Sequence, residues 1–191
     1  MTRKFAVLCV CTGNICRSPA AERLLAAALG AEIDVLSAGT LALVGRWIDS
    51  PMDRLIVLAG ADVSDFEARM LREPMLRAAD LILTMTDAHT GDVIEMWPRA
   101  VRKTFTIREF ARLLGSIDST ALPQTTVAER LRAAIPLAAA SRRPVADRTR
   151  DDVADPYRQA DKAYEQAFDA IRDAVDQIAR VIVLDRDQER L

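Results

Sequence analysis

The chain has 191 residues and a formal net charge of −2 at pH 7, and half of its residues (50%) are hydrophobic. This is the composition of an ordinary globular protein, and the length predicts one domain over residues 1–191 with a sizeable core. The near-neutral charge disfavours a nucleic-acid-binding protein, whose surface is usually basic, and no apolar run is long enough to span a membrane.

Short apolar runs alternate with segments of helical periodicity along the chain. Strands are predicted at residues 5–10, 33–37, 81–85 and 101–107, and helices at residues 19–29, 50–59, 87–96, 108–114, 127–140 and 161–184. This alternation is typical of an α/β protein with parallel strands. We therefore predict a three-layer αβα sandwich with a four-stranded parallel sheet, in which ligands bind beyond the carboxyl ends of the strands.

Serine followed by proline opens two of the predicted helices. Ser18-Pro19 and Ser50-Pro51 each combine a good N-cap residue with a proline suited to the first helical position. The segment 115–152 is atypical, because it joins polar turns, an alanine-rich helix and a highly charged stretch. Pro136 is expected to break or kink that helix. We interpret this segment as an insertion that covers or regulates a site, binds a partner or is inert.

The cysteines and the single histidine constrain the chemistry. Cys9, Cys11 and Cys16 are too close in sequence and odd in number for a disulfide framework, which favours a reducing, cytoplasmic location. His89 and the scattered acids do not form a metal-binding pattern, so we expect no metal and no cofactor. His89 is interpreted as an exposed helix residue.

The loop between the first strand and the first helix carries the most informative motif, Val-Cys-Thr-Gly-Asn-Ile-Cys-Arg-Ser-Pro at residues 10–19. A loop at a helix N-terminus directs backbone N–H groups towards an anion, and Arg17 adds paired hydrogen bonds to a phosphoryl group. Positive potential favours the thiolate form of Cys11, and the Ser18 hydroxyl can donate to its sulfur. The loop therefore predicts a cysteine nucleophile that faces a bound phosphate.

A phosphate ester also needs a proton for its leaving group. Asp155-Pro156-Tyr157, just before the last helix, supplies a candidate general acid on a stiffened backbone and a flat apolar face for an aromatic substrate. Cys16 lies inside the anion loop. It either protects Cys11 as a reversible disulfide partner or simply packs the loop.

The string at residues 10–19 closely resembles the signature of the low-molecular-weight protein tyrosine phosphatases, and Asp155-Pro156-Tyr157 matches that family's motif before the last helix. The similarity covers residues 5–114 and 153–184. The resemblance implies metal-independent hydrolysis of phosphotyrosine through a phosphocysteine, with Cys11 as nucleophile and Asp155 as general acid and then base. Arg17 and the loop bind the phosphate, and the implied binding residues are Thr12, Gly13, Asn14, Ile15, Cys16 and Ser18.

The resemblance extends to supporting residues. Ser37 of Ser37-Ala38-Gly39 would hydrogen-bond Asn14, whereas Phe66 stands where some relatives carry a histidine that braces the loop. Ile15 is bulky and apolar, which favours a phenyl ring over a charged guanidinium. Tyr157 and Trp47 are the expected walls around that ring. A protein arginine phosphatase of the same fold, a thiol-dependent arsenate reductase and a non-catalytic phosphate-binding module are the alternatives.

Overall fold

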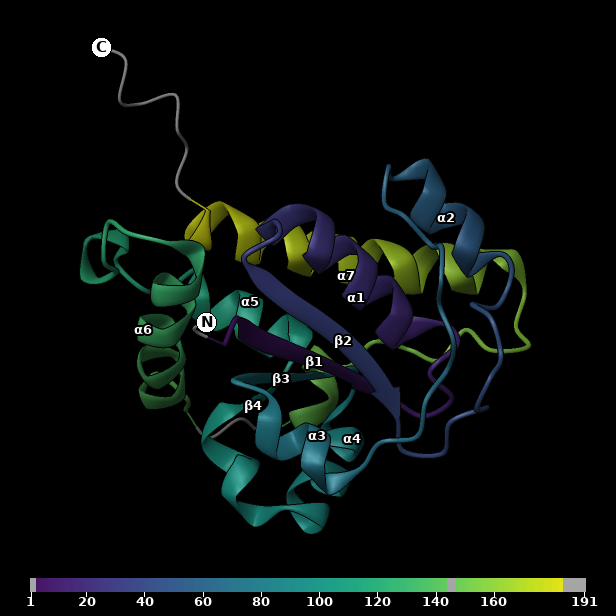
Figure 1. Ribbon diagram of the computed structural model, residues 1–191, viewed down its shortest axis with the longest axis horizontal. Coiled ribbons are helices and arrows are strands. Elements are labelled where there is room, and N and C mark those ends of the chain that lie inside the picture. The colour runs from purple at the N-terminus through teal and green to yellow at the C-terminus, as the bar shows by residue number, and fades with distance from the viewer. Residues whose placement is uncertain (1–2, 144–146, 184–191) are drawn as a thin grey trace.

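The computed structural model describes residues 3–143 and 147–183, in which four parallel strands form one sheet in the order β2-β1-β3-β4 (Figure 1). The strands are β1 (Phe5–Cys11), β2 (Ile33–Gly39), β3 (Leu81–Thr84) and β4 (Thr104–Thr106). β1 is central and pairs with β2 from Phe5↔Ile33 to Cys11↔Gly39. The predicted α/β class and the four-stranded parallel sheet are confirmed.

Helices cover both faces of the sheet. Their bounds are α1 (Arg17–Leu29), α2 (Met52–Leu58), α3 (Glu73–Ala78), α4 (Asp87–Met96), α5 (Ile107–Leu114), α6 (Val127–Ala140) and α7 (Asp161–Ile182), and the short turns are η1 (Pro98–Lys103), η2 (Ser119–Ala121) and η3 (Arg148–Asp151). α1, α5 and α7 pack on one face, and α3 and α4 lie on the other (Figure 1). This is the predicted three-layer sandwich.

Alternation along β1 explains the two cores. Residues 5, 7, 9 and 11 face the larger core beneath α1, α5 and α7. Leu8 and Val10 face a smaller core that also contains Leu76 of α3 and Val93 of α4. Because successive strand side chains point to opposite faces, β1 is buried on both sides and its carboxyl end holds Cys11 firmly in place.

The atypical segment 115–152 packs against the main fold. In α6, Leu131, Ala134 and Ala138 are buried and belong to the larger core. The expected break at Pro136 is wrong, because α6 continues through it. Pro136 and Arg132 are both exposed, so the Arg132 carbonyl that loses its helical partner faces water.

Two arginines fix this segment to the rest of the fold. The Arg142 guanidinium donates from Nη2 to the Thr104 carbonyl of the edge strand β4, at 2.6 Å. It also forms an ion pair with Glu109 at 2.9 Å. The Arg130 guanidinium is buried and donates to carbonyls at the end of α7. Figure 1 shows α6 near the amino ends of the strands, away from the loop that follows β1.

Several predicted boundaries differ from the structure. β4 is shorter than expected, because η1 takes up residues 98–103. The second Ser-Pro pair does not cap α2, whose first turn instead uses backbone: the N–H of Asp53 donates to the Asp49 carbonyl. The end predicted for the last helix, Leu184, lies outside the described residues.

Among residues 3–143 and 147–183, none of the helices has the length and apolar character needed to span a bilayer.

Candidate active site

The loop after β1 is held by its carbonyl groups. The carbonyl oxygens of residues 11–13 accept hydrogen bonds of 2.9–3.0 Å from backbone N–H groups of the segment 40–43. The Ile15 carbonyl accepts from the Asp49 N–H at 2.7 Å. Within the described residues, the backbone N–H groups of residues 12–18 donate to no other atom. With the carbonyls directed away, these N–H groups form a cradle for an anion at the start of α1.

Asn14 sets the shape of the loop. Its φ is 53°, a left-handed value that asparagine tolerates better than most residues. Its buried side chain donates to the hydroxyls of Ser37 and Ser18, at 2.8 and 3.0 Å, and accepts from the Arg69 N–H at 2.8 Å. The predicted contact between Asn14 and Ser37 is therefore present.

Gly39 allows β2 to approach the loop closely. A Cβ atom on Gly39 would lie 2.3 Å from the Thr12 carbonyl oxygen, well inside any real contact. Only glycine fits this position without moving the loop. The Ser-Ala-Gly triplet therefore has two functions: Ser37 binds Asn14, and Gly39 makes room for the backbone.

Glu22 of α1 also supports this network, although it was not predicted from the sequence. Glu22 is buried and accepts a hydrogen bond from Ser37, which in turn accepts from Asn14. Phe66, fully buried, stands beneath the guanidinium of Arg23 at 5.6 Å. A glutamate on the buried face of an otherwise apolar helix was the sequence signal for this support.

The sulfur of Cys11 lies on the floor of the loop, 2.9 Å from the hydroxyl oxygen of Ser18. Ser18 accepts from Asn14, so its own proton is available to the sulfur. The predicted N-cap role of Ser18 is wrong, because the helix begins at Arg17 and its N-cap position is Cys16. Ser18 is held inside the first turn by Cys11 and Asn14 instead.

Arg17 and Asp155 meet above this floor. Arg17 Nη2 lies 2.7 Å from Asp155 Oδ2, and Nη1 donates to the Val153 carbonyl at 3.1 Å. The Arg17 side chain is only 5% exposed, whereas that of Asp155 is 52% exposed. The arginine is therefore fixed by the fold, and the carboxylate lies at the mouth of the site.

A cleft of about 150 Å³ opens over the sulfur. Its floor is formed by loop residues: Cys11, Thr12, Gly13, Cys16 and Arg17. Asp155 and four apolar side chains form the walls: Ile15, Leu41, Leu43 and Tyr157. The sequence had not indicated Leu41 and Leu43 as site residues. Their signal is an apolar pair directly after the Ser-Ala-Gly triplet.

Three predicted binding residues do not line this cleft. Asn14 and Ser18 are fully buried behind the loop, where they support it. Trp47 is 46% exposed and lines a separate shallow cavity with Val44, Phe66 and Arg69. Trp47 therefore does not form the second wall around the sulfur, a position that Leu41 and Leu43 occupy.

Cys16 is buried beside an acid. Its sulfur lies 4.0 Å from Asp49 Oδ2, which also accepts a hydrogen bond of 2.6 Å from the Tyr164 hydroxyl. Burial, and then the charge of Asp49, raise the pKa of the Cys16 thiol well above its usual range. Cys16 is consequently a thiol at neutral pH.

His89 is a buried residue behind the loop, so the expectation of an exposed helix residue is wrong. Its Nε2 lies 2.9 Å from the Thr12 hydroxyl oxygen and its Nδ1 lies 2.7 Å from that of Thr86. Burial, and then the positive charge of Arg17, lower the pKa of His89 to about 4. The imidazole is therefore neutral and joins the loop to the start of α4.

Residues 3–143 and 147–183 contain no group of three or more histidine, cysteine, aspartate or glutamate side chains that could hold a metal ion.

Comparison with known proteins agrees with this geometry. Residues 6–119 match the family described as low molecular weight phosphotyrosine protein phosphatase. The chain is 29% identical over 170 residues to a protein of Ralstonia nicotianae named probable low molecular weight protein-tyrosine-phosphatase EpsP, covering 89% of this chain and 90% of that one.

Solved structures share the fold over nearly the whole chain. The tyrosine phosphatase AmsI of Erwinia amylovora superposes with a TM-score of 0.69 at 26% identity, covering 96% of both chains. Vibrio vulnificus Wzb in complex with benzylphosphonate gives 0.67 at 26% identity, covering 93% and 99%. The YwlE arginine phosphatase of Geobacillus stearothermophilus gives 0.68 at 25% identity, covering 92% and 91%.

Proposed function

Because this chain belongs to the low molecular weight phosphotyrosine protein phosphatase family, we propose that it hydrolyses phosphotyrosine monoesters of proteins through a phosphocysteine intermediate. One observation carries the proposal: the Cys11 sulfur, the unpaired N–H groups of the loop, Arg17 and Asp155 converge on a single cleft. No residue of this proposed mechanism requires a metal ion.

In the first step, the loop N–H groups and Arg17 hold the three non-bridging oxygens of the phosphate. The Cys11 thiolate attacks phosphorus, so that the S–P bond forms as the bond to the phenolic oxygen breaks. Ser18 donates to the sulfur and stabilises its negative charge. Asp155 gives its proton to the departing phenolic oxygen.

In the second step, water replaces the phenol. Asp155, now a carboxylate, accepts a proton from that water as the oxygen attacks phosphorus. The S–P bond breaks and inorganic phosphate leaves. The electron pair returns to Cys11 as a thiolate, and the enzyme is ready for another substrate.

Substrate binding changes the partner of Arg17. Without an anion, Arg17 pairs with Asp155 at 2.7 Å. A phosphate dianion in the loop offers oxygens to the same guanidinium and repels the neighbouring carboxylate. This exchange releases the Asp155 carboxyl group from Arg17, so that it can face the leaving-group oxygen at the mouth of the site.

The walls of the cleft favour an aromatic substrate. Ile15, Leu41, Leu43 and Tyr157 present apolar surface around the sulfur. A phenyl ring buries against such walls, whereas the charged guanidinium of phosphoarginine would lose water without gaining a partner. The fold itself does not discriminate, since tyrosine and arginine phosphatases both superpose on this chain.

A panel of phosphotyrosine, phosphoarginine and phosphoserine peptides tests the proposal. We expect phosphotyrosine to give the highest kcat/KM, Cys11→Ser to abolish turnover, and excess EDTA to leave turnover unchanged.

The Asp155→Asn variant should form the phosphoenzyme at a rate roughly 10²–10⁴-fold below normal, and acid quenching should trap this intermediate. Preference for phosphoarginine would assign the alternative activity, and thiol-dependent arsenate reduction without ester hydrolysis would assign the reductase.

A further inference from the structure

A larger cavity lies apart from the catalytic cleft. Its volume is about 840 Å³, and residues of α4, β4 and α5 line it together with residues 141–143, 150 and 151. Among the described residues, none lines both this cavity and the cleft over Cys11. A volume of several hundred Å³ is typical of sites for small organic molecules.

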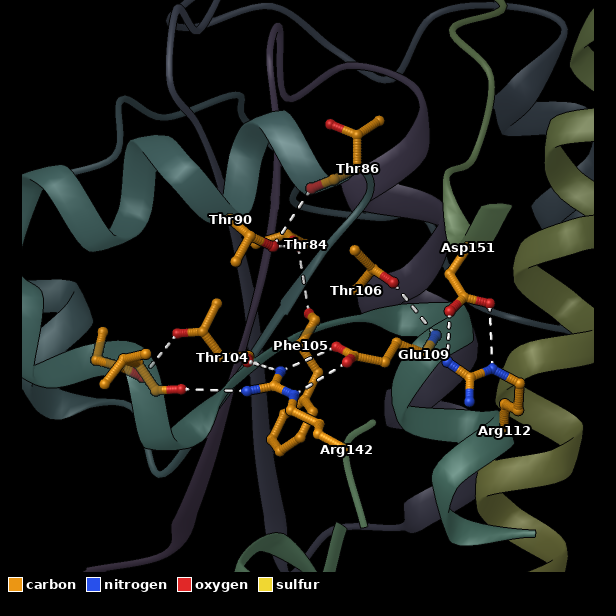
Figure 2. Close-up of polar contacts among 12 residues, drawn as sticks. Thr84, Thr86, Thr90, Thr104, Phe105, Thr106, Glu109, Arg112, Arg142 and Asp151 are labelled. Atoms are coloured by element: carbon orange, nitrogen blue, oxygen red, sulfur yellow. Dashed lines mark hydrogen bonds and ion pairs between the residues drawn. The ribbon is translucent and has the colours of Figure 1, made fainter. Parts of the chain in front are cut away.

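Charged side chains are the largest group among the lining residues. Four arginines and three acids line the cavity: Arg112, Arg142, Arg143, Arg150, Asp87, Glu109 and Asp151. Figure 2 shows that the Arg142 guanidinium and the Glu109 carboxylate form a two-pronged pair, with both distances at 2.9 Å. Arg143 is exposed and has no ion pair with any described residue. The arginines are thus not fully neutralised by the acids.

Asp151 is shared between two arginines. Its Oδ2 lies 2.6 Å from Arg112 Nη2 and 3.5 Å from Arg150 Nε. The Arg112 pair is drawn in Figure 2. Both guanidiniums keep further N–H groups, and their side chains are 42% and 43% exposed. A phosphate monoester carries more charge and more acceptor oxygens than one carboxylate, so it can replace Asp151 between them.

Hydroxyl groups line another part of the cavity and indicate what the rest of the ligand contains. Ser116 and Ser141, both exposed, each donate their hydroxyl proton to a backbone carbonyl, at 2.7 and 2.9 Å. Their oxygens keep acceptor lone pairs. A ligand that satisfies them must bring its own donors, such as hydroxyl groups.

We propose that this cavity is a second binding site, which takes a small hydroxylated phosphomonoester with its phosphate between Arg112, Arg143 and Arg150. Its hydroxyls donate to the oxygens of Ser116 and Ser141. The segment 115–152, which supplies part of the wall, builds a ligand site rather than serving as an inert surface extension.

A short segment of the chain connects the cavity to Asp155, the catalytic acid. Asp151 precedes Asp155 by four residues, and the intervening Val153 is bonded at both ends. Its N–H donates to the Met85 carbonyl at 2.8 Å, and its carbonyl accepts from Arg17 at 3.1 Å. We expect a ligand that displaces Asp151 to shift this segment, and with it the position of Asp155. This consequence rests on the proposed phosphatase function, whereas binding to the cavity does not.

Calorimetric titration of the Cys11→Ser variant tests binding without turnover. Phenylphosphonate is first added at a concentration just sufficient to fill the catalytic cleft, because its anionic head could also enter the cavity although its apolar ring offers the cavity no donor. The probes are then glycerol 3-phosphate, ribose 5-phosphate and adenosine 5′-monophosphate. Inorganic phosphate tests the phosphate group alone, and glycerol tests the hydroxylated part alone. We expect one equivalent of at least one ester to bind more tightly than either part.

Adding Arg143→Gln and Arg150→Gln should weaken that binding about tenfold or more, since two charge-assisted partners are lost. Arg143→Gln alone, at an exposed residue with no described ion pair, should give a smaller loss without affecting folding. Arg99→Gln, an exposed arginine of η1 outside the cavity, is the matched control and should change nothing. No binding after the cleft is saturated, or equal affinity in the double variant, would overturn the site. Inorganic phosphate binding as tightly as every ester would overturn the ligand class.

Steady-state hydrolysis of an aryl phosphate by the otherwise unaltered chain tests the connection to Asp155. The bound ester should change kcat relative to the ester-free value of the same protein, and this relative change should disappear in the Arg143→Gln, Arg150→Gln variant. An effect on KM alone, equal in both proteins, would mean simple competition in the cleft and would contradict the coupling. If the chain proves not to be a phosphatase, the calorimetric result still stands or falls by itself.

Discussion

At Gly39 a single hydrogen atom in place of a side chain lets two parts of the active site touch. The Cβ of any other residue would lie 2.3 Å from the Thr12 carbonyl oxygen. That carbonyl accepts from the Leu41 N–H, which helps to turn the loop N–H groups towards the anion. Steric freedom at residue 39 therefore determines the geometry of phosphate binding.

The Gly39→Ala variant should lose both stability and activity. Overpacking of this kind costs about 1–3 kcal/mol in the free energy of unfolding, and a displaced loop lowers kcat by ~10²-fold. Urea denaturation and aryl phosphate hydrolysis measure the two effects. Gly91→Ala is the control, because Gly91 lies inside α4 with open space around it. The free energy of unfolding of Gly91→Ala should rise by ~0.5–1 kcal/mol, and its activity should be unchanged. Similar losses of stability and activity in both variants would contradict the steric explanation.

His89 gives the fold a dependence on mildly acidic pH. Its pKa is lowered from 6.5 to about 4 by burial and by Arg17, with Asp92 and Asp155 acting in the opposite direction. The unfolded chain therefore takes up this proton near pH 6.5, and the folded chain only near pH 4. The contribution to stability is complete above pH 6.5 and is lost progressively as pH falls towards 4, by on the order of 3 kcal/mol.

Urea unfolding at a series of pH values measures this loss. The His89→Gln variant keeps hydrogen-bonding groups beside Thr12 but does not titrate, so its free energy of unfolding should stay flatter between pH 6.5 and 4. Asp62, Asp118 and Asp147 do not obscure the comparison, because their pKa values are lowered from 3.8 and their losses come at more acidic pH. Parallel curves for the two proteins would show that His89 does not titrate in this range.

At the scale of elements, α6 is joined to α7 by one buried arginine. Arg130 donates to the carbonyls of Val181 and Ile182, at 2.7 and 2.8 Å, and to that of Pro123 at 2.9 Å. The last carbonyls of a helix have no partner within it, and a cation there also suits the helix dipole. Arg130 therefore closes the end of α7 from a neighbouring helix.

Arg130→Met should destabilise the fold without affecting the chemistry. The buried carbonyls lose their donors, at a cost of about 1–3 kcal/mol for each that stays unpaired. The melting temperature should fall. The value of kcat should stay unchanged, because Asp155 lies before the opposite end of α7. Arg180→Met, at an exposed arginine of the same helix, is the matched control and should leave the melting temperature unchanged. A fall in kcat at temperatures where the Arg130 variant is folded would contradict the separation.

The elements that sequence patterns predicted well are those whose patterns are local. The continuous apolar run of β1 reflects burial on both faces, and the three- and four-residue steps of α7 reflect one buried face. The failures involve side-chain partners that no periodicity in the sequence indicates. Ser18 has the chemistry of an N-cap, but Cys11 and Asn14 hold its hydroxyl. His89 looked exposed because nothing nearby in sequence announces its contact with Thr12, 77 residues away.

The whole molecule should respond to an anion in the loop. A ligand that binds only the folded chain raises the free energy of unfolding, by about 2.7 kcal/mol at one hundred times its dissociation constant. We expect sulfate to raise the melting temperature, and the Arg17→Met variant to lose most of this shift because Arg17 is the cation of the cleft. Arg99→Gln controls for general salt effects. An equal shift in all three proteins would place the stabilisation elsewhere.

The Cys11 loop, Arg17 and Asp155 were predictable because a few adjacent residues carry each motif. The walls of the cleft were not, since Trp47 and Leu43 lie four residues apart in one irregular loop. Only Leu43 lines the cleft, and no periodicity indicates which side of such a loop faces inward. The path of residues 115–152 was equally hidden, because it depends on the carbonyl groups that Arg130 and Arg142 reach.

The position of Arg142 has a consequence for solubility. β4 is the outermost strand on its side of the sheet, and Arg142 occupies its Thr104 carbonyl. A bare outer strand is a template on which another copy of the chain can extend the sheet. A shortened protein that lacks residues 115–152 would expose the outer edge of β4, so we expect it to aggregate more readily than the full chain.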